Sequence, residues 1–264
     1  MAAGPEHINL DESTLLADSD SNSYSYVRTK AQADIMVLKA NRRMSKQNQS
    51  GLLTACIRLP IVYGERDLVS IPGALAALEK NQTNFQLGDG SNMWDFASAD
   101  NAAKAHILLA EALLRSVEKD YTTPKVDGEA FNITDGQPHL FWDFPLIIWK
   151  AAGWEPPADR AKKMVILPTR LALVIAVMME WIYWVVTLGT QRPGLLSKQQ
   201  VWISCYTHTY RIDKAKERLG YKPVPDFEAG IQKAVAWLLE EGGWGPRLQQ
   251  PQSTLEKPET KSQS

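Results

Sequence analysis

The apolar residues near the beginning of the chain fall into two kinds of pattern. Over Ser23–Arg43 they recur three or four positions apart, which predicts an amphipathic helix. The run Leu52–Leu59 is short, continuous and mostly apolar, which is typical of a strand buried on both faces of a parallel sheet. Pro60 ends that strand, and the loop Val62–Asp67 follows at its carboxyl end. Because ligands bind at the carboxyl ends of strands in open α/β sheets, this loop is a candidate part of a site.

The rest of the chain alternates between predicted helices and short predicted strands. Helices are predicted over 72–80, 101–116, 141–152, 214–219 and 227–241, and strands over 84–87, 95–98, 129–134 and 209–212. Asp100 and Asp226 precede two of these helices and are predicted as their N-caps. From residue 243 the chain is polar and rich in Gln, Ser, Pro and Lys, which predicts a disordered tail over 243–264.

The most apolar stretch is Leu171–Leu188, which is just long enough to cross a bilayer. Glu180 lies at its centre, where a carboxylate is costly in lipid. Trp181 and Trp184 also lie in the middle of the stretch rather than at its ends, where interfacial aromatic residues belong. The sequence therefore favours a helix beside an apolar ligand site, or a helix lying in a membrane surface, over a true span.

Composition and charge exclude several classes of protein. The chain has 264 residues, 44% of them hydrophobic and 22% charged, which is typical of a globular protein. The net charge of -1 argues against a nucleic-acid surface. Cys56 and Cys205 fit neither a metal spacing nor a disulfide framework, and the four histidines are scattered, so no metal site is predicted. Residues 1–16 lack the apolar core of a signal peptide, so secretion is not predicted.

Tyr26 and Lys30 are four positions apart in the first predicted helix, so their side chains share one face. They lie beside the apolar face that carries Ala31, Ile35 and Leu38, at the edge of a buried surface. A free phenol loses its proton only near pH ~10, and an ammonium group one turn away favours the phenolate. The pair is therefore a candidate general base. The alternative is an ordinary exposed pair, because this spacing occurs by chance in many helices.

Several motifs follow one another along the chain in a fixed order. They are Tyr26-x-x-x-Lys30, Arg58–Gly64, Trp94–His106, Gly128–Thr134, Phe141–Phe144 and Leu219–Pro223. In this order they resemble the extended short-chain dehydrogenases, most closely the 3β-hydroxysteroid dehydrogenase group, which includes the sterol 4α-carboxylate 3-dehydrogenases. The resemblance covers about residues 8–240, and the concurrence in order is far more specific than any single motif.

The resemblance implies an α/β fold with an incomplete Rossmann-type parallel sheet and a smaller, mostly helical C-terminal substrate domain. Residues 1–136 would form the C-terminal part of a Rossmann-like domain, with interleaved substrate-domain segments, and residues 137–242 a substrate-binding helical region. The family's Gly-x-x-Gly-x-x-Gly turn, its ribose-binding acidic residue and its catalytic Ser or Thr are not found in the sequence. We expect the C-terminal two-thirds of such an enzyme: an incomplete gene product, a degenerate member, or a shortened enzyme completed by a partner.

The resemblance also implies roles for individual residues. Tyr26 matches the catalytic Tyr, whose phenolate takes the proton of the substrate hydroxyl while hydride passes to the nicotinamide of NAD or NADP. Lys30 matches the Lys that favours the phenolate and hydrogen-bonds the nicotinamide ribose. Pro60, Ile61 and Val62 match the segment whose backbone approaches the nicotinamide. The alternative for Pro60 is that it only ends a strand.

The leading hypothesis for function is an NAD(P)-dependent oxidoreductase that oxidises a 3β-type hydroxyl of a sterol, terpenoid or related polycycle to a ketone. A rival hypothesis is a non-catalytic family member that acts as a membrane-associated or partner-binding subunit. A third keeps the family but changes the reaction, to an epimerase or a ketone reductase. The predicted location is the cytoplasm or the cytosolic face of the endoplasmic reticulum, with membrane contact through Leu171–Leu188. A homodimer is left open.

Overall fold

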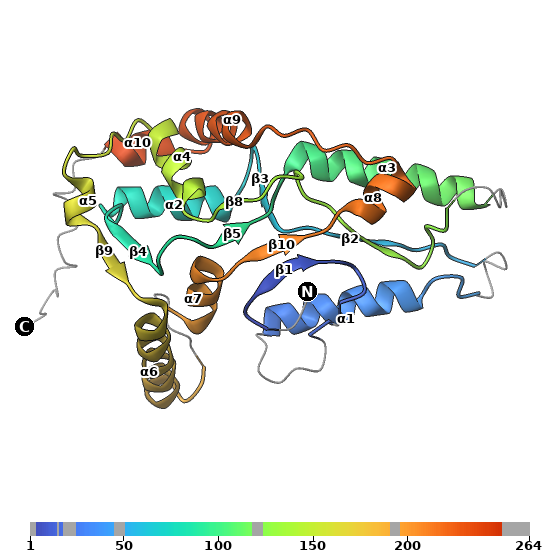
Figure 1. Cartoon of the computed structure of the whole chain (residues 1–264), viewed down its shortest axis with the longest axis horizontal. Coiled ribbons are helices and arrows are strands. Elements are labelled where there is room, and N and C mark those ends of the chain that lie inside the picture. The colour runs from blue at the N-terminus through green and yellow to red at the C-terminus, as the bar shows by residue number, and fades with distance from the viewer. Residues whose placement is uncertain are drawn as a thin grey trace, which may run out of the picture.

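A computed structural model of the chain describes residues 4–14, 16–17, 25–44, 51–117, 124–190 and 196–249. The strands in these ranges are β1 (His7–Leu10), β2 (Cys56–Arg58), β3 (Ile61–Tyr63), β4 (Phe85–Leu87), β5 (Met93–Trp94), β6 (Phe96–Ser98), β7 (Ala130–Asn132), β8 (His139–Leu140), β9 (Val165–Leu167) and β10 (His208–Tyr210). The helices are α1 (Ser25–Lys39), α2 (Ser70–Glu79), α3 (Ala99–Val117), α4 (Asp143–Ala151), α5 (Arg160–Lys163), α6 (Thr169–Thr187), α7 (Lys198–Cys205), α8 (Asp213–Leu219), α9 (Phe227–Glu240) and α10 (Trp244–Gln249). The mixture of helices and parallel strands confirms the predicted α/β class (Figure 1).

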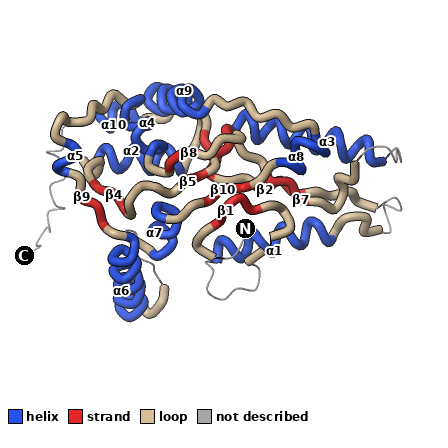
Figure 2. Tube along the Cα trace, viewed as in Figure 1, coloured by secondary structure: helices blue, strands red, loops and turns tan. Residues whose placement is uncertain are grey.

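The strands run through the middle of the molecule, with helices on both sides (Figure 2). β1, β10, β5 and β8 form one sheet in that order, while β2 pairs with β7, β3 with β6 and β4 with β9. Each pairing is parallel except that of β5 with β8. Parallel neighbours cannot be joined by a tight turn, so each pair brings together distant parts of the chain. In β1 and β10, for example, His7 lies opposite His208.

The prediction that Leu52–Leu59 forms a strand buried on both faces is wrong in its length and its burial. The paired strand is shorter, and its three residues are half-buried. Within the described ranges β2 pairs with β7 alone, which leaves its other edge without a strand. Ile57 still packs against the buried cluster that contains Phe131 and Ile133. The apolar run correctly indicated a strand, but burial depends on neighbours that a local pattern does not reveal.

The helix boundaries also depart from their predicted positions. The first described helix, α1, ends at Lys39 rather than Arg43, and Arg42 adopts a positive φ of 56° in the turn that follows. Asp100 is not an N-cap, because α3 begins at Ala99 and Ser98 Oγ accepts the hydrogen bond from the Asn101 amide instead. Asp226 does precede α9, but its side chain makes no capping hydrogen bond there.

The core consists of three clusters of buried residues. The largest joins α2, α4, α9 and α10 to β3 and β6, with Tyr63, Phe96 and Ile231 among its fully buried members. A second joins α3, β7 and α8, and a third packs α6 and α7 on β4. Glu129 pairs with Lys214, which holds α8 to the start of β7. The predicted division at residue 137 stays a prediction, although α8 and β10 from beyond it pack with elements that precede it.

The sequence did not predict three of the described helices, which are α5, α7 and α10. Helix α7 begins at a capping box, in which Ser197 Oγ accepts from the Gln200 amide and Gln200 Oε1 accepts from the Ser197 amide. Helix α10 lies where a disordered tail was predicted to begin. Its Trp244 is buried, and Arg247 lies 3.9 Å from the centre of that ring while pairing with Glu79. These tertiary contacts order a polar segment whose composition alone indicated disorder. Residues 250–264 lie outside the described residues.

A buried pair of histidines joins β1 to β10. His7 Nδ1 lies 3.1 Å from His208 Nδ1 and 2.9 Å from the Tyr210 hydroxyl. Burial, and then the neighbouring His7, lower the pKa of His208 to about 3. Close by, Asp95 accepts a hydrogen bond from the Tyr210 amide, and burial raises the pKa of Asp95 to about 6. Both shifts make the free energy of unfolding depend on pH, in opposite directions.

We expect His208 and Asp95 to oppose each other between pH 7 and pH 5. Unfolded His208 gains a proton below pH ~6.5 that the folded form does not bind, so acidification removes about 2 kcal/mol of stability. Folded Asp95 is protonated below about pH 6 and unfolded Asp95 is not, so acidification adds about 1 kcal/mol. Urea unfolding at the two pH values should show a deeper acid loss in Asp95→Asn and a reduced or reversed loss in His208→Gln. The same pH dependence in both variants and wild type would contradict this assignment.

Candidate active site

Helix α1 lies along β2 and runs in the opposite direction. Thr54 Oγ1, just before β2, donates to the Val37 carbonyl, and the Cys56 thiol donates to the Asp34 carbonyl. Arg58, the last residue of β2, pairs with the Asp34 side chain. Residue numbers therefore fall along α1 as they rise along β2. The first turn of α1 consequently extends past the carboxyl end of β2, the edge at which ligands bind in open α/β sheets.

Tyr26 and Lys30 lie on this first part of α1. The Lys30 ammonium nitrogen is 5.8 Å from the centre of the Tyr26 ring, so the two side chains do meet on one face of the helix. Tyr26 is 54% exposed, and Lys30 is also exposed. Ala31 is fully buried beneath the helix. The pair thus stands at the edge of a buried surface, as predicted, and its catalytic role stays a prediction.

The predicted segment Pro60–Val62 lies where the chain leaves one pair of strands and enters the next. Pro60 follows β2 by two residues, and Ile61 and Val62 belong to β3, opposite Phe96 and Ala97 of β6. All three residues of the segment are half-buried. The segment therefore begins at the carboxyl end of β2, the edge past which the first turn of α1 extends.

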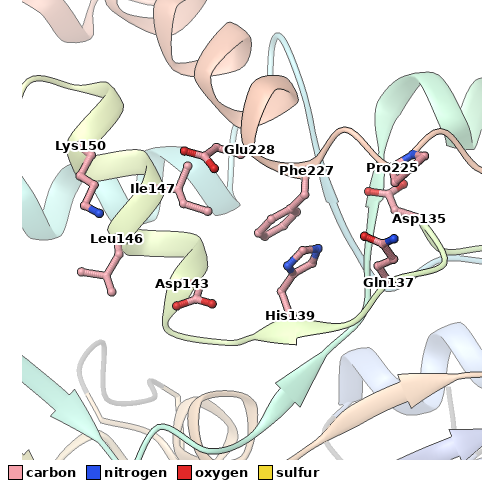
Figure 3. Close-up of a pocket in the computed structure, with 10 residues that line it drawn as sticks. All are labelled: Asp135, Gln137, His139, Asp143, Leu146, Ile147, Lys150, Pro225, Phe227 and Glu228. Carbon is pink, nitrogen blue, oxygen red and sulfur yellow. The ribbon is translucent and has the colours of Figure 1, made fainter.

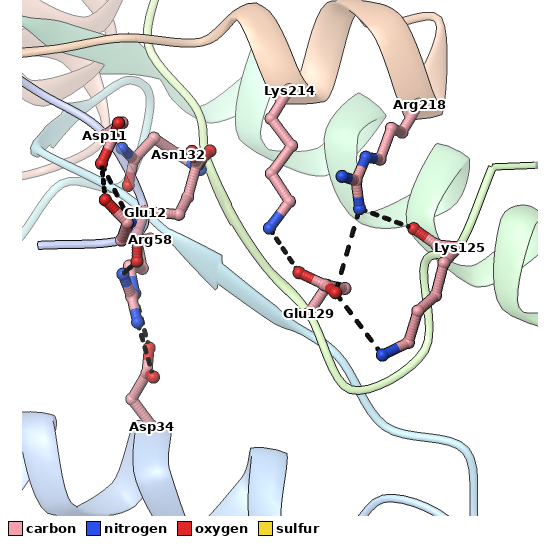
Figure 4. Close-up of polar contacts among 10 residues, drawn as sticks. Asp11, Glu12, Asp34, Arg58, Lys125, Glu129, Asn132, Lys214 and Arg218 are labelled. Carbon is pink, nitrogen blue, oxygen red and sulfur yellow. Dashed lines mark hydrogen bonds and ion pairs between the residues drawn. The ribbon is translucent and has the colours of Figure 1, made fainter.

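A polar network ties these elements together at the ends of β2 and β7 (Figure 4). Arg58 donates to both carboxylate oxygens of Asp34, at 2.8 and 2.9 Å, and to the Glu12 carbonyl at 3.0 Å. Glu12 Oε1 accepts from the Asn132 amide, and the Asn132 side chain donates to the Leu10 carbonyl. Arg58 and Asn132 belong to two of the sequence motifs, but the sequence did not predict this network, because its members are distant along the chain.

A second unpredicted group surrounds Asp135, which follows β7. Its carboxylate accepts hydrogen bonds from the Tyr63 hydroxyl at 2.8 Å, the Asn101 side chain at 2.7 Å and the Ser98 amide at 2.9 Å. Burial, and then the Asp135 charge, raise the pKa of Tyr63, so its hydroxyl stays a donor at any working pH. Gly230 permits this packing, because a β-carbon there would lie 3.0 Å from the Tyr63 ring. Tyr63 therefore has a structural role in the core.

A cavity of ≈ 380 Å³ lies between α4, β8 and the start of α9 (Figure 3). Its lining residues are Asp135, Gln137, His139, Asp143, Leu146, Ile147, Lys150, Pro225, Phe227 and Glu228. His139 stacks flat on Phe227, with ring centres 4.0 Å apart. None of the five predicted site residues lines this cavity. The cavity is therefore distinct from the site predicted around Tyr26 and Lys30.

The apolar stretch forms helix α6, which projects from the body of the molecule (Figure 1). Among the described residues it is the one helix long and apolar enough to cross a membrane, and only 11% of that apolar window is buried. Ala172 and Ala176 are its buried residues, and they pack with Val201 of α7. Glu180 accepts a hydrogen bond from the Lys198 amide at the start of α7. The central carboxylate thus faces α7.

The cofactor-binding residues were predicted for the nicotinamide end of a dinucleotide alone, and that role stays a prediction. Tyr26, Lys30 and the backbone at Pro60–Val62 offer the groups predicted for the nicotinamide and its ribose. No Gly-x-x-Gly-x-x-Gly turn is found in the sequence for the pyrophosphate. Among the described residues, no three His, Cys, Asp or Glu side chains gather as a metal site.

Parallel strands with covering helices, and a Tyr-x-x-x-Lys helix beside the parallel strand β2, define a Rossmann-type α/β protein, and solved structures agree. The structure described as gox2253 superposes with a TM-score of 0.59 at 21% identity, covering 89% of this chain and 62% of that one. The dTDP-glucose 4,6-dehydratase DesIV from Streptomyces venezuelae superposes with a TM-score of 0.56 at 17% identity, covering 92% and 58%. The predicted Rossmann-type fold is confirmed.

Residues 2–163 match the model of the 3-beta hydroxysteroid dehydrogenase/isomerase family, so the chain belongs to that family. The sterol-4-alpha-carboxylate 3-dehydrogenase erg26, decarboxylating, of Schizosaccharomyces pombe is 34% identical over 238 residues. That alignment covers 90% of this chain and 63% of the relative. The predicted family is therefore confirmed, and the chain spans less than two thirds of the relative's length.

Proposed function

We propose that this chain carries the alcohol-oxidising residues of an NAD(P)-dependent oxidoreductase. The proposed substrate is a sterol, terpenoid or related polycycle with a 3β-type hydroxyl, which is oxidised to a ketone. The observation that carries the proposal is the Tyr26–Lys30 pair, held past the carboxyl end of β2 in a member of this family. The Schizosaccharomyces pombe relative is a sterol-4-alpha-carboxylate 3-dehydrogenase, which supports the choice of a sterol-like substrate.

Each site residue has a distinct proposed role. Tyr26, as the phenolate, accepts the proton of the substrate hydroxyl, which is general base catalysis. Lys30 lies beside the Tyr26 ring, so its positive charge stabilises the phenolate and it can donate to a ribose hydroxyl. The backbone at Pro60–Val62 would line the nicotinamide end of the site. NAD or NADP supplies the hydride acceptor when it is bound.

Turnover by the purified 264-residue chain tests this proposal. The chain would be given NAD or NADP with a panel of 3β-hydroxy polycycles, and the matching 3α-hydroxy compounds would serve as controls. We expect a ketone from the 3β compounds and an increase in absorbance at the wavelength of the reduced cofactor. No ketone with either cofactor would contradict the proposal for this chain.

The rival function is a non-catalytic subunit that binds a membrane or a partner. One observation favours it: Tyr26 is 54% exposed. Calorimetry with NAD and NADP separates the two functions. Binding of either dinucleotide in the micromolar range would dismiss the rival, whereas no detectable binding and no turnover would favour it. An epimerase or ketone reductase would show binding with a different product.

We further propose that α6 lies in a membrane surface and does not cross it. A helix that packs on α7 and turns Glu180 toward it presents one apolar side to lipid, as interfacial helices do. Trp181 and Trp184 are exposed on α6, and Arg170 at its start offers a positive charge to anionic headgroups. This contact agrees with the predicted location on the cytosolic face of the endoplasmic reticulum. A homodimer stays a prediction.

Exchange of both tryptophans tests the membrane contact. The wild-type chain should float with vesicles of phosphatidylcholine and phosphatidylserine, and the double variant Trp181→Ser, Trp184→Ser should bind at least about tenfold more weakly. Leu114→Ser, at a 70% exposed position on α3, is the matched control and should float like wild type. Equal flotation of all three chains would show that α6 does not make the contact.

A further inference from the structure

Arg58 holds two separate parts of the chain with one guanidinium group. Its Nε and Nη2 donate to the two oxygens of Asp34 on α1, at 2.8 and 2.9 Å. Its Nη1 donates to the Glu12 carbonyl at 3.0 Å, on the loop that precedes α1. Figure 4 shows Arg58 between the two. The side chains of Arg58 and Asp34 are only 19% and 9% exposed, so solvent screens the pair weakly.

The two contacts lie on either side of the segment that carries Tyr26 and Lys30. Glu12 precedes this segment and Asp34 follows it. Glu12 is itself fixed, because its carboxylate accepts from the Asn132 amide of β7 at 2.8 Å. The anchors before and after the proposed catalytic pair are thus joined to the ends of β2 and β7.

Helix geometry makes the position of Tyr26 sensitive to a small tilt of α1 at Asp34. Asp34 is four residues after Lys30 and eight after Tyr26, so Tyr26 lies about 12 Å farther along the helix axis. A tilt of about 5° at Asp34 would displace Tyr26 by about 1 Å, and a displacement of that size can cost a hundredfold in rate. Planar, bidentate contact resists such a tilt, which a single ammonium contact would not.

We infer that Arg58 is a positioning residue, which through Asp34 and Glu12 holds Tyr26 and Lys30 at the carboxyl end of β2. The inference rests on the proposed function. The bonds of the Arg58 guanidinium go to Asp34 and Glu12, so Arg58 acts on Tyr26 and Lys30 through the backbone of α1.

The other end of α1 supplies a matched control. There Asp127 accepts from Arg42 Nε at 2.7 Å and from the Asn41 side chain at 2.8 Å. Asp127→Asn weakens the anchor beyond the C-terminus of α1, as Asp34→Asn weakens the one nearer Tyr26. Arg58→Lys keeps the positive charge and removes the planar guanidinium group that donates to both Asp34 oxygens.

The experiment compares these variants in the full chain by kcat, KM and unfolding temperature. Arg58→Lys and Asp34→Asn should lower kcat about a hundredfold and leave KM within about threefold, because misplacement of the base affects the chemical step. Asp127→Asn should lower the unfolding temperature about as much as Arg58→Lys and Asp34→Asn do. Its kcat should nevertheless stay within about threefold of wild type. An unchanged kcat in Arg58→Lys and Asp34→Asn, or an equal loss in Asp127→Asn, would overturn the inference.

Amide hydrogen exchange distinguishes failure of this inference from failure of the proposed function. If the wild-type chain oxidises no alcohol, the proposed function fails for this chain, and exchange then decides the anchoring alone. Amides of residues 29–33, the first with partners inside α1, should exchange about tenfold faster in Arg58→Lys and Asp34→Asn, and at the wild-type rate in Asp127→Asn. Unchanged exchange at residues 29–33 in the first two would refute anchoring by Arg58. Should Arg58→Lys fail to fold, the isosteric Asp34→Asn carries the test.

Discussion

Tyr26→Phe is expected to lower kcat for alcohol oxidation by about 10²–10⁴-fold, the usual contribution of a positioned general base. The substitution removes one oxygen and keeps the ring, so the contact of Lys30 with the ring survives. Because Tyr26 is 54% exposed and its side chain belongs to no core cluster, the unfolding temperature should stay within about 1 °C of wild type. Steady-state turnover with a 3β-hydroxy polycycle and a thermal melt measure both quantities.

The control for this result is Tyr206→Phe, which removes a phenolic oxygen far along the chain, just after α7. It should retain wild-type kcat and KM. Lys30→Met should lower kcat and also weaken dinucleotide binding, because its proposed role includes the ribose. Equal turnover by Tyr26→Phe and wild type would remove Tyr26 from the mechanism, whatever the family membership of the chain.

Asp135→Ala is expected to reduce the free energy of unfolding by about 3–5 kcal/mol. The Tyr63 hydroxyl and the Ser98 amide would lose their carboxylate acceptor. The Asn101 side chain would lose its bond to Asp135 and keep its two bonds to the Val224 backbone, one donated to the carbonyl and one accepted from the amide. Each buried donor left without an acceptor costs about 1–3 kcal/mol. Urea unfolding at neutral pH measures the effect.

Two further variants separate the hydrogen bonds of Asp135 from simple loss of volume. Asp135→Asn keeps the shape and one acceptor oxygen, so it should lose only about 1–2 kcal/mol. A double-mutant cycle of Asp135→Ala with Tyr63→Phe should show a coupling energy above about 1 kcal/mol, since the two groups share a 2.8 Å hydrogen bond. Additive effects of the two substitutions would show that this bond contributes nothing to stability.

Local patterns predicted the elements that depend on local spacing. The helix carrying Tyr26 and Lys30, the strand around Ile57 and the helix after Ser98 were all expected within a few residues of where they lie. Most errors concerned helix boundaries. Asp100, for example, was predicted as an N-cap but lies inside α3, because a capping residue and its neighbour inside the helix look alike in sequence. Helices α5, α7 and α10 were missed because none has a clear apolar period. Burial of Trp244 against the core orders α10.

The residues of the candidate site also divide into those that the sequence predicted and those that only the structure revealed. Tyr26, Lys30 and Pro60–Val62 were found by motif spacing and by the resemblance, which needs no coordinates. Asp135 and the Arg58–Asp34 pair were not found, because their partners are distant in the chain. Tyr63 and Asp135 are separated by 72 positions, and Arg58 and Asp34 by 24. An isolated Asp or Arg in a sequence carries no sign of the residue it will meet.

The sequence by itself determined the family, the α/β class and the shared helical face of Tyr26 and Lys30. These follow from residue order and from the fixed periods of helix and strand, which act over a few positions. Only the tertiary structure decided which way α1 runs along β2, which groups Arg58 and Asp135 bind, and that α6 remains largely uncovered. Those features arise from contacts between distant residues, and such contacts exist only once the chain has folded.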